Sequence, residues 1–339
     1  MTNTRNYLFH GLNLGLAGEP RVLDALHSRL RCFPAGFAHR DFDLDFEYVR
    51  DAGRGSGAAR LPAGNGRVIL EFGNCQALYF DGPQQLFLEA GSHGRMLCDI
   101  GTRRATVAYP KSEEADPWLL SHLFFTVPLA ELLKRLGLYM AHMAGVALKG
   151  KGLLIAGESG AGKTTLALAL LRAGFAFLAD DTVFLSTSSG LRALAFPDEI
   201  DITPQTATFF PELRRPDRES THGRRKKRPI CAGEVCQMEP CWECRPAIIL
   251  FPRPGRSPES TLAPMPKDQA LMKLAGNVLR TELRSAQAHL DALAAVVRQC
   301  RCYRLQTGRD FDRLALRLRG MVAPTPAQGH DAKTSIKKL

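Results

Sequence analysis

The segment 157–164 reads Gly-Glu-Ser-Gly-Ala-Gly-Lys-Thr, which is the complete G-x-x-x-x-G-K-[ST] pattern of a phosphate-binding loop. A short apolar run at 152–156 precedes the loop and is typical of a buried strand. The residues after Lys163 are mostly good helix formers, and Gly174 follows where a helix C-cap belongs. Strand, glycine loop and helix in this order predict an α/β unit that binds a nucleoside triphosphate. A strand-to-helix turn without a ligand is the alternative.

The residue types of this loop suit a triphosphate. Its glycines let the backbone curl so that successive N–H groups point at a phosphate, and the helix N-terminus adds partial positive charge. The Lys163 ammonium can reach the β- and γ-phosphates, and the Thr164 hydroxyl is placed to ligate Mg²⁺. We therefore expect ATP and Mg²⁺ as cofactors. The expected nucleotide-binding residues are Gly157, Glu158, Ser159, Gly160, Ala161, Gly162, Lys163, Thr164 and Thr165.

Two aspartates, Asp180 and Asp181, follow in the apolar segment 175–185. The apolar flanks predict a strand, with the acidic pair at a strand end facing the loop; a solvated turn is the alternative. Successive strand residues point to opposite faces, so only one carboxylate can enter the site squarely unless the strand breaks there. We therefore expect one aspartate to act as a base toward an acceptor hydroxyl and the other to hold Mg²⁺.

Asp180 follows Lys163 by 17 positions, and His142 precedes it by 21. This arrangement resembles the HPr kinase/phosphorylase family and its relatives, bacterial P-loop serine kinases akin to phosphoenolpyruvate carboxykinase. Their pattern is a His-containing segment, a strand, G-x-S-G-x-G-K-[ST], a helix, and a strand carrying Asp-Asp. The resemblance covers about residues 139–187 and is closer to divergent members, because the Leu-Glu-Ile-Arg-Gly signature of true HPr kinases has no counterpart after Asp181.

The resemblance implies a catalytic set of Asp180, His142 and Lys163. Asp180 would take the proton from the acceptor serine, Asp181 and Thr164 would be associated with Mg²⁺, and His142 would lie near the phosphates. A core histidine is the alternative for His142. The implied function is a kinase that transfers the γ-phosphate of ATP to a serine or other hydroxyl on a protein or peptide. A small-molecule kinase and a catalytically silent ATP-binding regulatory protein remain open.

The expected fold class is α/β, with a P-loop kinase core of the HPr kinase/PEP carboxykinase-like type and a separate mixed α+β N-terminal domain. The N-terminal domain, 1–115, is expected to hold a helix at 21–30 and several short strands, and its role is not readable from the sequence. The remaining expected parts are a helical connection at 116–141, the kinase domain at 142–320 and a disordered basic tail at 321–339. Late helices are predicted at 263–279 and 282–298, then a strand at 301–305 and a helix at 310–319.

The composition, 45% apolar and 23% charged, is ordinary for a globular protein. The most apolar stretch, 118–133, is short and contains Pro128 and Glu131, which favours buried helices over a membrane span. Nine cysteines without an export signal favour reduced thiols and a cytoplasmic location. The expected partner is a protein or peptide phosphate acceptor, and a homo-oligomer is left open.

The positive charge is uneven, because residues 214–228 carry eight Lys or Arg against two acidic residues, a net +6 of the chain's +11. One interpretation is a loop over the active site whose cations meet phosphates or an acidic peptide; a solvated loop is the other. Nucleic acid is disfavoured because no aromatic platform interleaves with the charges.

Four thiols form the pattern C-x₄-C-x₄-C-x₂-C. Four cysteines this close can bind Zn²⁺ tetrahedrally, although the spacing departs from the usual paired motif. The alternative is a set of small apolar residues packed in a crossover. The candidate zinc ligands are Cys231, Cys236, Cys241 and Cys244.

Overall fold

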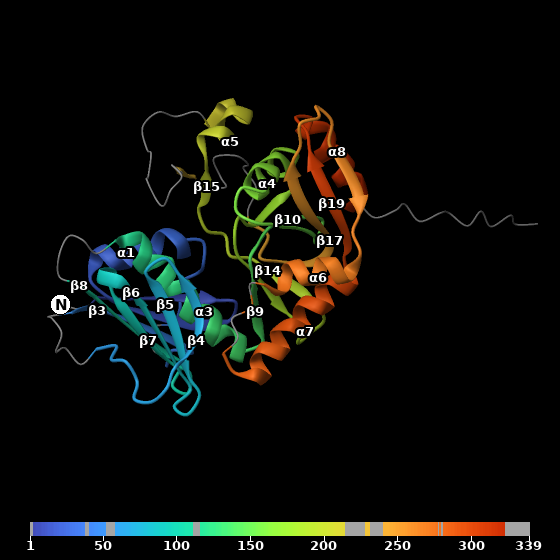
Figure 1. Cartoon of the computed structure of the whole chain (residues 1–339). Coiled ribbons are helices and arrows are strands. Elements are labelled where there is room, and N and C mark those ends of the chain that lie inside the picture. Colours follow the sequence, from blue (N-terminus) through green and yellow to red (C-terminus); the bar gives the residue numbers. More distant parts are fainter. Residues whose placement is uncertain are drawn as a thin grey trace, which may run out of the picture.

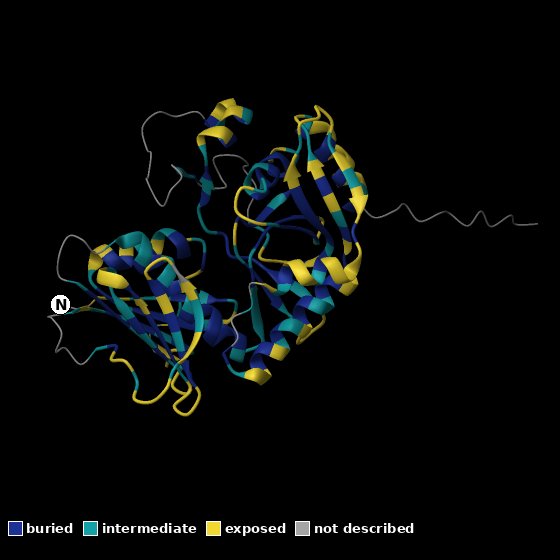
Figure 2. Ribbon diagram, viewed as in Figure 1, coloured by how far each residue is buried: buried dark blue, intermediate teal, exposed yellow. Residues whose placement is uncertain are grey.

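The computed structural model describes residues 3–37, 41–51, 58–110, 116–213, 228–230, 240–276, 278 and 281–322. It is a mixed α/β structure with two large sheets and a short two-stranded one. Figure 1 shows the first large sheet, with its helices, beside the second. Figure 2 shows buried residues running through both halves, which agrees with separate apolar clusters on each sheet.

The first sheet has eight strands in the order β1-β2-β3-β8-β7-β6-β5-β4. Helix α1 (Pro20–Leu30) connects β2 to its parallel neighbour β3, and the β4 to β8 strands form antiparallel hairpins. The strand bounds are β1 Asn3–Phe9, β2 Leu12–Gly18, β3 Leu44–Asp51, β4 Arg67–Phe72, β5 Cys75–Phe80, β6 Gln85–Ala90, β7 Arg95–Asp99 and β8 Arg104–Pro110.

Three helices cover one face of this sheet: α1, α2 (Pro117–Ser121) and α3 (Leu123–Arg135). Helix α1 begins with a proline at its first turn, and its apolar residues Val22, Leu26 and Leu30 recur every four positions, so they face the sheet together. The Asp116 side chain caps α2 by accepting from the Trp118 amide at 2.9 Å. Two helices, separated at His122, therefore occupy most of the connection that the sequence predicts as helical at 116–141.

The second sheet runs β12-β10-β11-β17-β14-β13-β9, with β19 beside β17 and β18 beside β19. The β11–β17 and β17–β19 pairs are parallel, and the others are antiparallel. The strand bounds are β9 Leu138–Ala141, β10 Met143–Leu148, β11 Lys151–Ala156, β12 Ala176–Ala179, β13 Val183–Ser186, β14 Arg192–Leu194, β17 Glu243–Pro254, β18 Thr261–Pro264 and β19 Arg301–Thr307.

Helices pack on both faces of the second sheet because its central strands are apolar on both sides. In β11, Leu153 and Ile155 join the cluster under α4 (Lys163–Arg172) and α8 (Phe311–Val322). Leu154 and Ala156 join the opposite cluster, under α6 (Lys267–Ala275) and α7 (Leu283–Gln299). Successive side chains of β11 therefore point to opposite faces of the sheet, and the strand lies between two helix layers.

Most elements predicted after the loop are present, but two predictions are corrected. The segment 175–185 is not one strand, because it breaks at Asp180 and Asp181 into β12 and β13, which pair with different neighbours. A helix over 263–279 is wrong, since 261–264 form β18 and α6 begins only at Lys267. Pro264 and Pro266 explain the late start, because proline lacks an amide hydrogen and disfavours helix in the residue before it.

The connection predicted as helical at 116–141 ends differently. Its last residues form β9, which pairs with β13 and so belongs to the second sheet. Helix α8 continues through Val322, two residues into the predicted tail, and 323–339 lie outside the described residues. No helix among the described residues is long and apolar enough to cross a membrane.

Candidate active site

The glycine loop lies between the end of β11 and the start of α4. Gly160 and Gly162 have φ values of +84° and +93°, in the left-handed region that favours glycine. Gly157 is needed for another reason, because a Cβ there would stand 3.0 Å from the Ala161 Cβ. Glu158, Ser159, Gly160 and Gly162 line a cavity, whereas Gly157 and Ala161 do not. The glycine positions therefore fix the shape of the loop.

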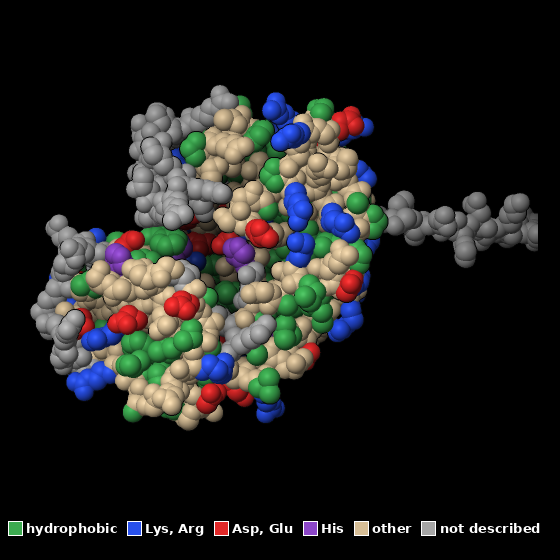
Figure 3. Space-filling model, viewed as in Figure 1, with side chains coloured by type: hydrophobic (Ala, Val, Ile, Leu, Met, Phe, Trp, Pro, Cys, Tyr) green, Lys and Arg blue, Asp and Glu red, His purple; other side chains and the backbone are tan. Residues whose placement is uncertain are grey.

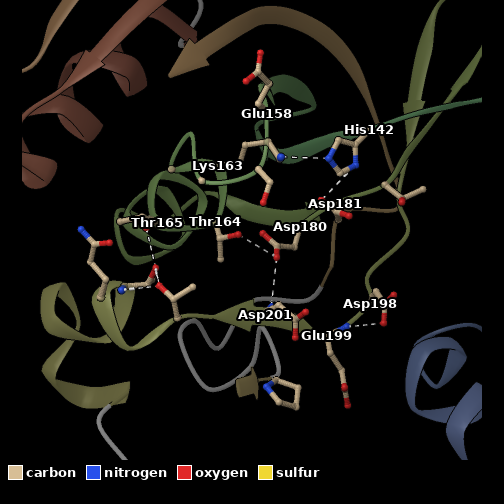
Figure 4. Close-up of a pocket in the computed structure, with 18 of the residues that line it drawn as sticks. His142, Glu158, Lys163, Thr164, Thr165, Asp180, Asp181, Asp198, Glu199 and Asp201 are labelled. Atoms are coloured by element: carbon tan, nitrogen blue, oxygen red, sulfur yellow. Dashed lines mark hydrogen bonds and ion pairs between the residues drawn. The ribbon is translucent and has the colours of Figure 1, made fainter. Parts of the chain in front are cut away.

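Lys163 opens α4 with its side chain almost fully buried at 8% exposure. Its ammonium donates to the Gly157 carbonyl at 2.9 Å and lies 3.2 Å from His142 Nε2. His142 Nδ1 is in turn 3.3 Å from Asp181 Oδ1. A lysine ammonium only donates, so Nε2 accepts from Lys163 and Nδ1 carries the proton that faces Asp181. Lys163, His142 and Asp181 thus form one line of polar contacts (Figure 4).

His142 follows β9 directly and precedes β10. Its side chain is 36% exposed and lines the same cavity as the loop. The alternative of a buried core histidine therefore does not hold.

Asp180 lies at the end of β12 beside the first turn of α4. The Thr164 hydroxyl donates to Asp180 Oδ2 at 3.2 Å, and the Asp201 backbone amide donates to the same oxygen at 3.4 Å. The residue is only 6% exposed, and its other oxygen, Oδ1, is buried and accepts no hydrogen bond from the described residues. Burial, and next the nearby charge of Asp181, raise the pKa of Asp180 to about 7. Asp180 can therefore gain or lose a proton near neutral pH.

The two carboxylates have different surroundings. Asp181 is 67% exposed and faces His142, while Asp180 is buried against Thr164. The break between β12 and β13 explains this, because both residues lie in a bend and can both enter the cavity. The sequence predicted different roles for the pair, but it grouped Thr164 with Asp181, whereas Thr164 contacts Asp180.

Thr165 points its hydroxyl at a neighbouring helix. Its Oγ1 is 3.0 Å from Thr206 Oγ1, which is 3.1 Å from Thr203 Oγ1 at the start of α5 (Pro204–Phe209). Thr203 also caps α5 by accepting from the Thr206 amide at 3.1 Å. These hydroxyls tie α4 to α5 and form part of the cavity lining.

The cavity has a volume of about 1180 Å³ and lies between the glycine loop and the first-sheet helices. Figure 3 shows acidic and histidine side chains at a hollow between the two halves of the molecule. One wall holds the loop, His142 and the aspartate pair; the opposite wall includes Arg29, Asp198 and these helix residues: Trp118, Leu119, His122, Leu123, Thr126 and Val127. Sequence reasoning missed this second wall, because no local pattern reports a contact between segments so far apart.

The remaining candidate sites are only partly described. Of the proposed zinc ligands, Cys231 and Cys236 lie outside the described residues. Cys244 is buried in β17, where burial raises the pKa of its thiol well above the usual range, and Cys241 lies beside the Glu243 carbonyl. Within the described ranges no three His, Cys, Asp or Glu side chains gather as a metal site. The basic run is likewise outside them, apart from Arg228.

No family model and no curated protein matches the chain. Among solved structures, it is similar to the Hpr(Ser) kinase/phosphatase from Coxiella burnetii. The match covers 54% of this chain and 93% of that one, with 13% sequence identity and a TM-score of 0.29. This is a weak structural similarity to a kinase/phosphatase.

Proposed function

We propose that this protein is an ATP-dependent kinase that transfers the γ-phosphate to a serine or other hydroxyl of a protein or peptide. The observation that carries the proposal is that Lys163, Thr164, Asp180, Asp181 and His142 meet beside one glycine loop (Figure 4). The proposed kinase domain spans 142–320 and is of the HPr kinase/PEP carboxykinase-like type.

The residues present fit Mg²⁺ and ATP. The loop backbone and the start of α4 would hold the triphosphate. The buried Lys163 ammonium contacts one carbonyl and one imidazole, and neither of these groups is anionic. Asp180 Oδ1 is a buried oxygen without a described donor, which suits a cation or a proton. Thr164 and Asp181 would hold Mg²⁺, and bound Mg²⁺-ATP would supply an activated phosphoryl group.

The work of the protein is then to position groups and to move one proton. Asp180, with a pKa of about 7, would accept the proton of the acceptor hydroxyl. Asp181 would hold His142, and His142 would orient the Lys163 ammonium toward the phosphates. We assign the base role to Asp180 and the metal role to Asp181. Because Thr164 also donates to Asp180, the two aspartates are tested by separate variants.

A small-molecule kinase is the second candidate, and the cavity itself favours it. Its volume of about 1180 Å³ exceeds the roughly 300–1,000 Å³ of a site for one small ligand, which leaves room for a small acceptor beside the nucleotide. The first wall would take the nucleotide, and the helix side chains opposite would contact the acceptor.

The test is incubation of the full chain with γ-labelled ATP, Mg²⁺ and cell lysate, with Lys163→Ala as the control. The proposal predicts a labelled protein or peptide whose phosphate is on a hydroxyl side chain, and no label with the variant. A labelled metabolite would instead establish a small-molecule kinase. Stoichiometric ATP binding with no labelled acceptor would contradict the kinase proposal and favour a regulatory ATP-binding protein.

A further inference from the structure

The segment 195–199, between β14 and β15 (Ile200–Ile202), is held by residues of the first-sheet half. The His10 imidazole lies 2.7 Å from the Ala195 carbonyl, through Nε2. Arg29, from α1, forms an ion pair with Asp198 at 2.5 Å. Arg31 lies 3.8 Å from the Glu199 carboxylate. Three residues from far earlier in the chain therefore contact Ala195, Asp198 and Glu199.

Arg29 makes the most specific of these contacts. It is 4% exposed, and its Nε donates to Asp198 Oδ2 at 2.6 Å. Its Nη1 donates to the Ser121 carbonyl at 2.5 Å and to the Thr126 hydroxyl at 2.9 Å. The guanidinium also lies over the Phe196 ring, 5.1 Å from its centroid. A planar guanidinium held on several sides has little freedom, so it fixes the position of Asp198.

Asp198 is connected to Asp180 through β15. The Asp198 side chain also accepts from the Glu199 amide at 2.8 Å, which orders the backbone directly before β15. Ile200 and Ile202 are buried in the cluster under α4. Between them, the Asp201 amide donates to Asp180 Oδ2. The position of β15 therefore depends on two contacts: the packing of Ile200 and Ile202 in the apolar cluster, and the hydrogen bond from the Glu199 amide to Asp198.

We propose that Arg29 is a positioning residue. Through its contact with Asp198, it holds β15 in the position from which the Asp201 amide donates to Asp180. The first-sheet half thereby completes the active site of the second-sheet half. The catalytic consequence rests on the proposed function, while the structural coupling from Arg29 to the Asp201 amide does not.

Two measurements on the full chain separate these parts. Hydrogen exchange of peptides covering 195–202 reports how firmly this segment and its amides are held, without any catalysis. Release of phosphate from Mg²⁺-ATP, with water in place of the acceptor hydroxyl, reports the site. Asp198→Asn keeps the side-chain shape but removes the charge that Arg29 meets. Arg29→Lys keeps a cation but loses the planar fork, and Asp24→Asn, in an exposed ion pair with Arg5, is the matched control.

For Asp198→Asn we expect exchange in 195–202 to accelerate by ~10-fold and phosphate release to slow by ~10-fold, since small misplacements can cost up to about 100-fold. ATP affinity should be unchanged, because neither Asp198 nor Arg29 belongs to the glycine loop. Arg29→Lys should be intermediate, and the control should match wild type.

Unchanged exchange in Asp198→Asn and Arg29→Lys would overturn the coupling. Accelerated exchange across the whole second sheet would also overturn it, because it would show a general structural role. Faster exchange confined to 195–202 with an unchanged rate of phosphate release would support the coupling while contradicting its catalytic consequence. The proposed function itself fails separately, if wild type labels no acceptor in lysate.

Discussion

The Thr164 hydroxyl donates to Asp180 Oδ2 across 3.2 Å, and this contact joins the first turn of α4 to the end of β12. It places the residue expected to bind Mg²⁺ beside the carboxylate expected to act as the base. The pKa of Asp180, about 7, is raised mainly by burial, so this carboxylate can accept a proton near neutral pH. Several expected outcomes depend on this arrangement.

The pH dependence of stability should carry the signature of Asp180. Its pKa is raised to about 7 in the folded protein, so the unfolded chain ionises first as the pH rises. Wild type should therefore lose stability relative to Asp180→Asn between about pH 4 and pH 7, by on the order of 4 kcal/mol at about 1.4 kcal/mol per pKa unit. Urea unfolding of both proteins across this range measures the difference.

The matched control for that titration is Asp24→Asn, at a side chain that is 66% exposed. Its stability should follow the wild-type curve at every pH. If the Asp180→Asn curve also runs parallel to wild type, Asp180 does not hold a proton near neutral pH in the folded state.

Lys163→Ala should weaken ATP binding by about 10-fold to 100-fold, because a hydrogen bond to a charged group is worth about 1.5–3 kcal/mol. The residue lies at the start of α4, where its ammonium already occupies the cavity lining. Lys151→Ala, at the other end of β11, is the control and should bind ATP like wild type. Isothermal titration calorimetry with ATP measures both affinities. Equal affinity for wild type and Lys163→Ala would contradict the prediction that the glycine loop and Lys163 bind ATP.

A buried ionic network joins the two halves near the start of α7. The Glu131 side chain is 0% exposed and lies 2.8 Å from Lys134 and 3.1 Å from Arg135. It also accepts from the Thr281 hydroxyl at 2.7 Å. Glu131→Gln should lower the free energy of unfolding by about 3–5 kcal/mol, because it leaves buried cations without their counter-charge.

The comparison for Glu131→Gln is Glu259→Gln, whose partner Arg313 is exposed. An exposed ion pair contributes about 0–1 kcal/mol, so this variant should unfold at nearly the wild-type urea concentration. Equal losses in both variants would contradict the structural role given to the Glu131 network.

The sequence predicted well what local residues determine. The glycine loop requires positive φ values that only glycine adopts easily, and the helix after it is encoded by its own residues. The break at Asp180 and Asp181 was harder, because apolar flanks predict a strand on each side and do not show that the two strands pair with different neighbours. Pro264 and Pro266 indicate that a helix cannot begin before them, and the prediction of a helix over 263–279 did not take them into account.

The second wall of the cavity could not be predicted. Arg29 and Asp198 are 169 positions apart, and each has an ordinary local context. The contact of Asp201 with Asp180 likewise depends on how β15 packs under α4, which is a tertiary property. The role of residues 1–115 was therefore opaque in the sequence, while the structure brings α1 and the helices after the first sheet to the cavity.

The most direct test of the central claim compares Asp180→Asn and Asp181→Asn with wild type in one assay of ATP affinity and γ-phosphate transfer to the labelled acceptor. If Asp180 is the base, Asp180→Asn should bind Mg²⁺-ATP like wild type and lose transfer by about 10²–10⁴-fold, the usual contribution of general base catalysis. Asp181→Asn should instead weaken the dependence of binding on Mg²⁺. Full transfer by Asp180→Asn would contradict the account.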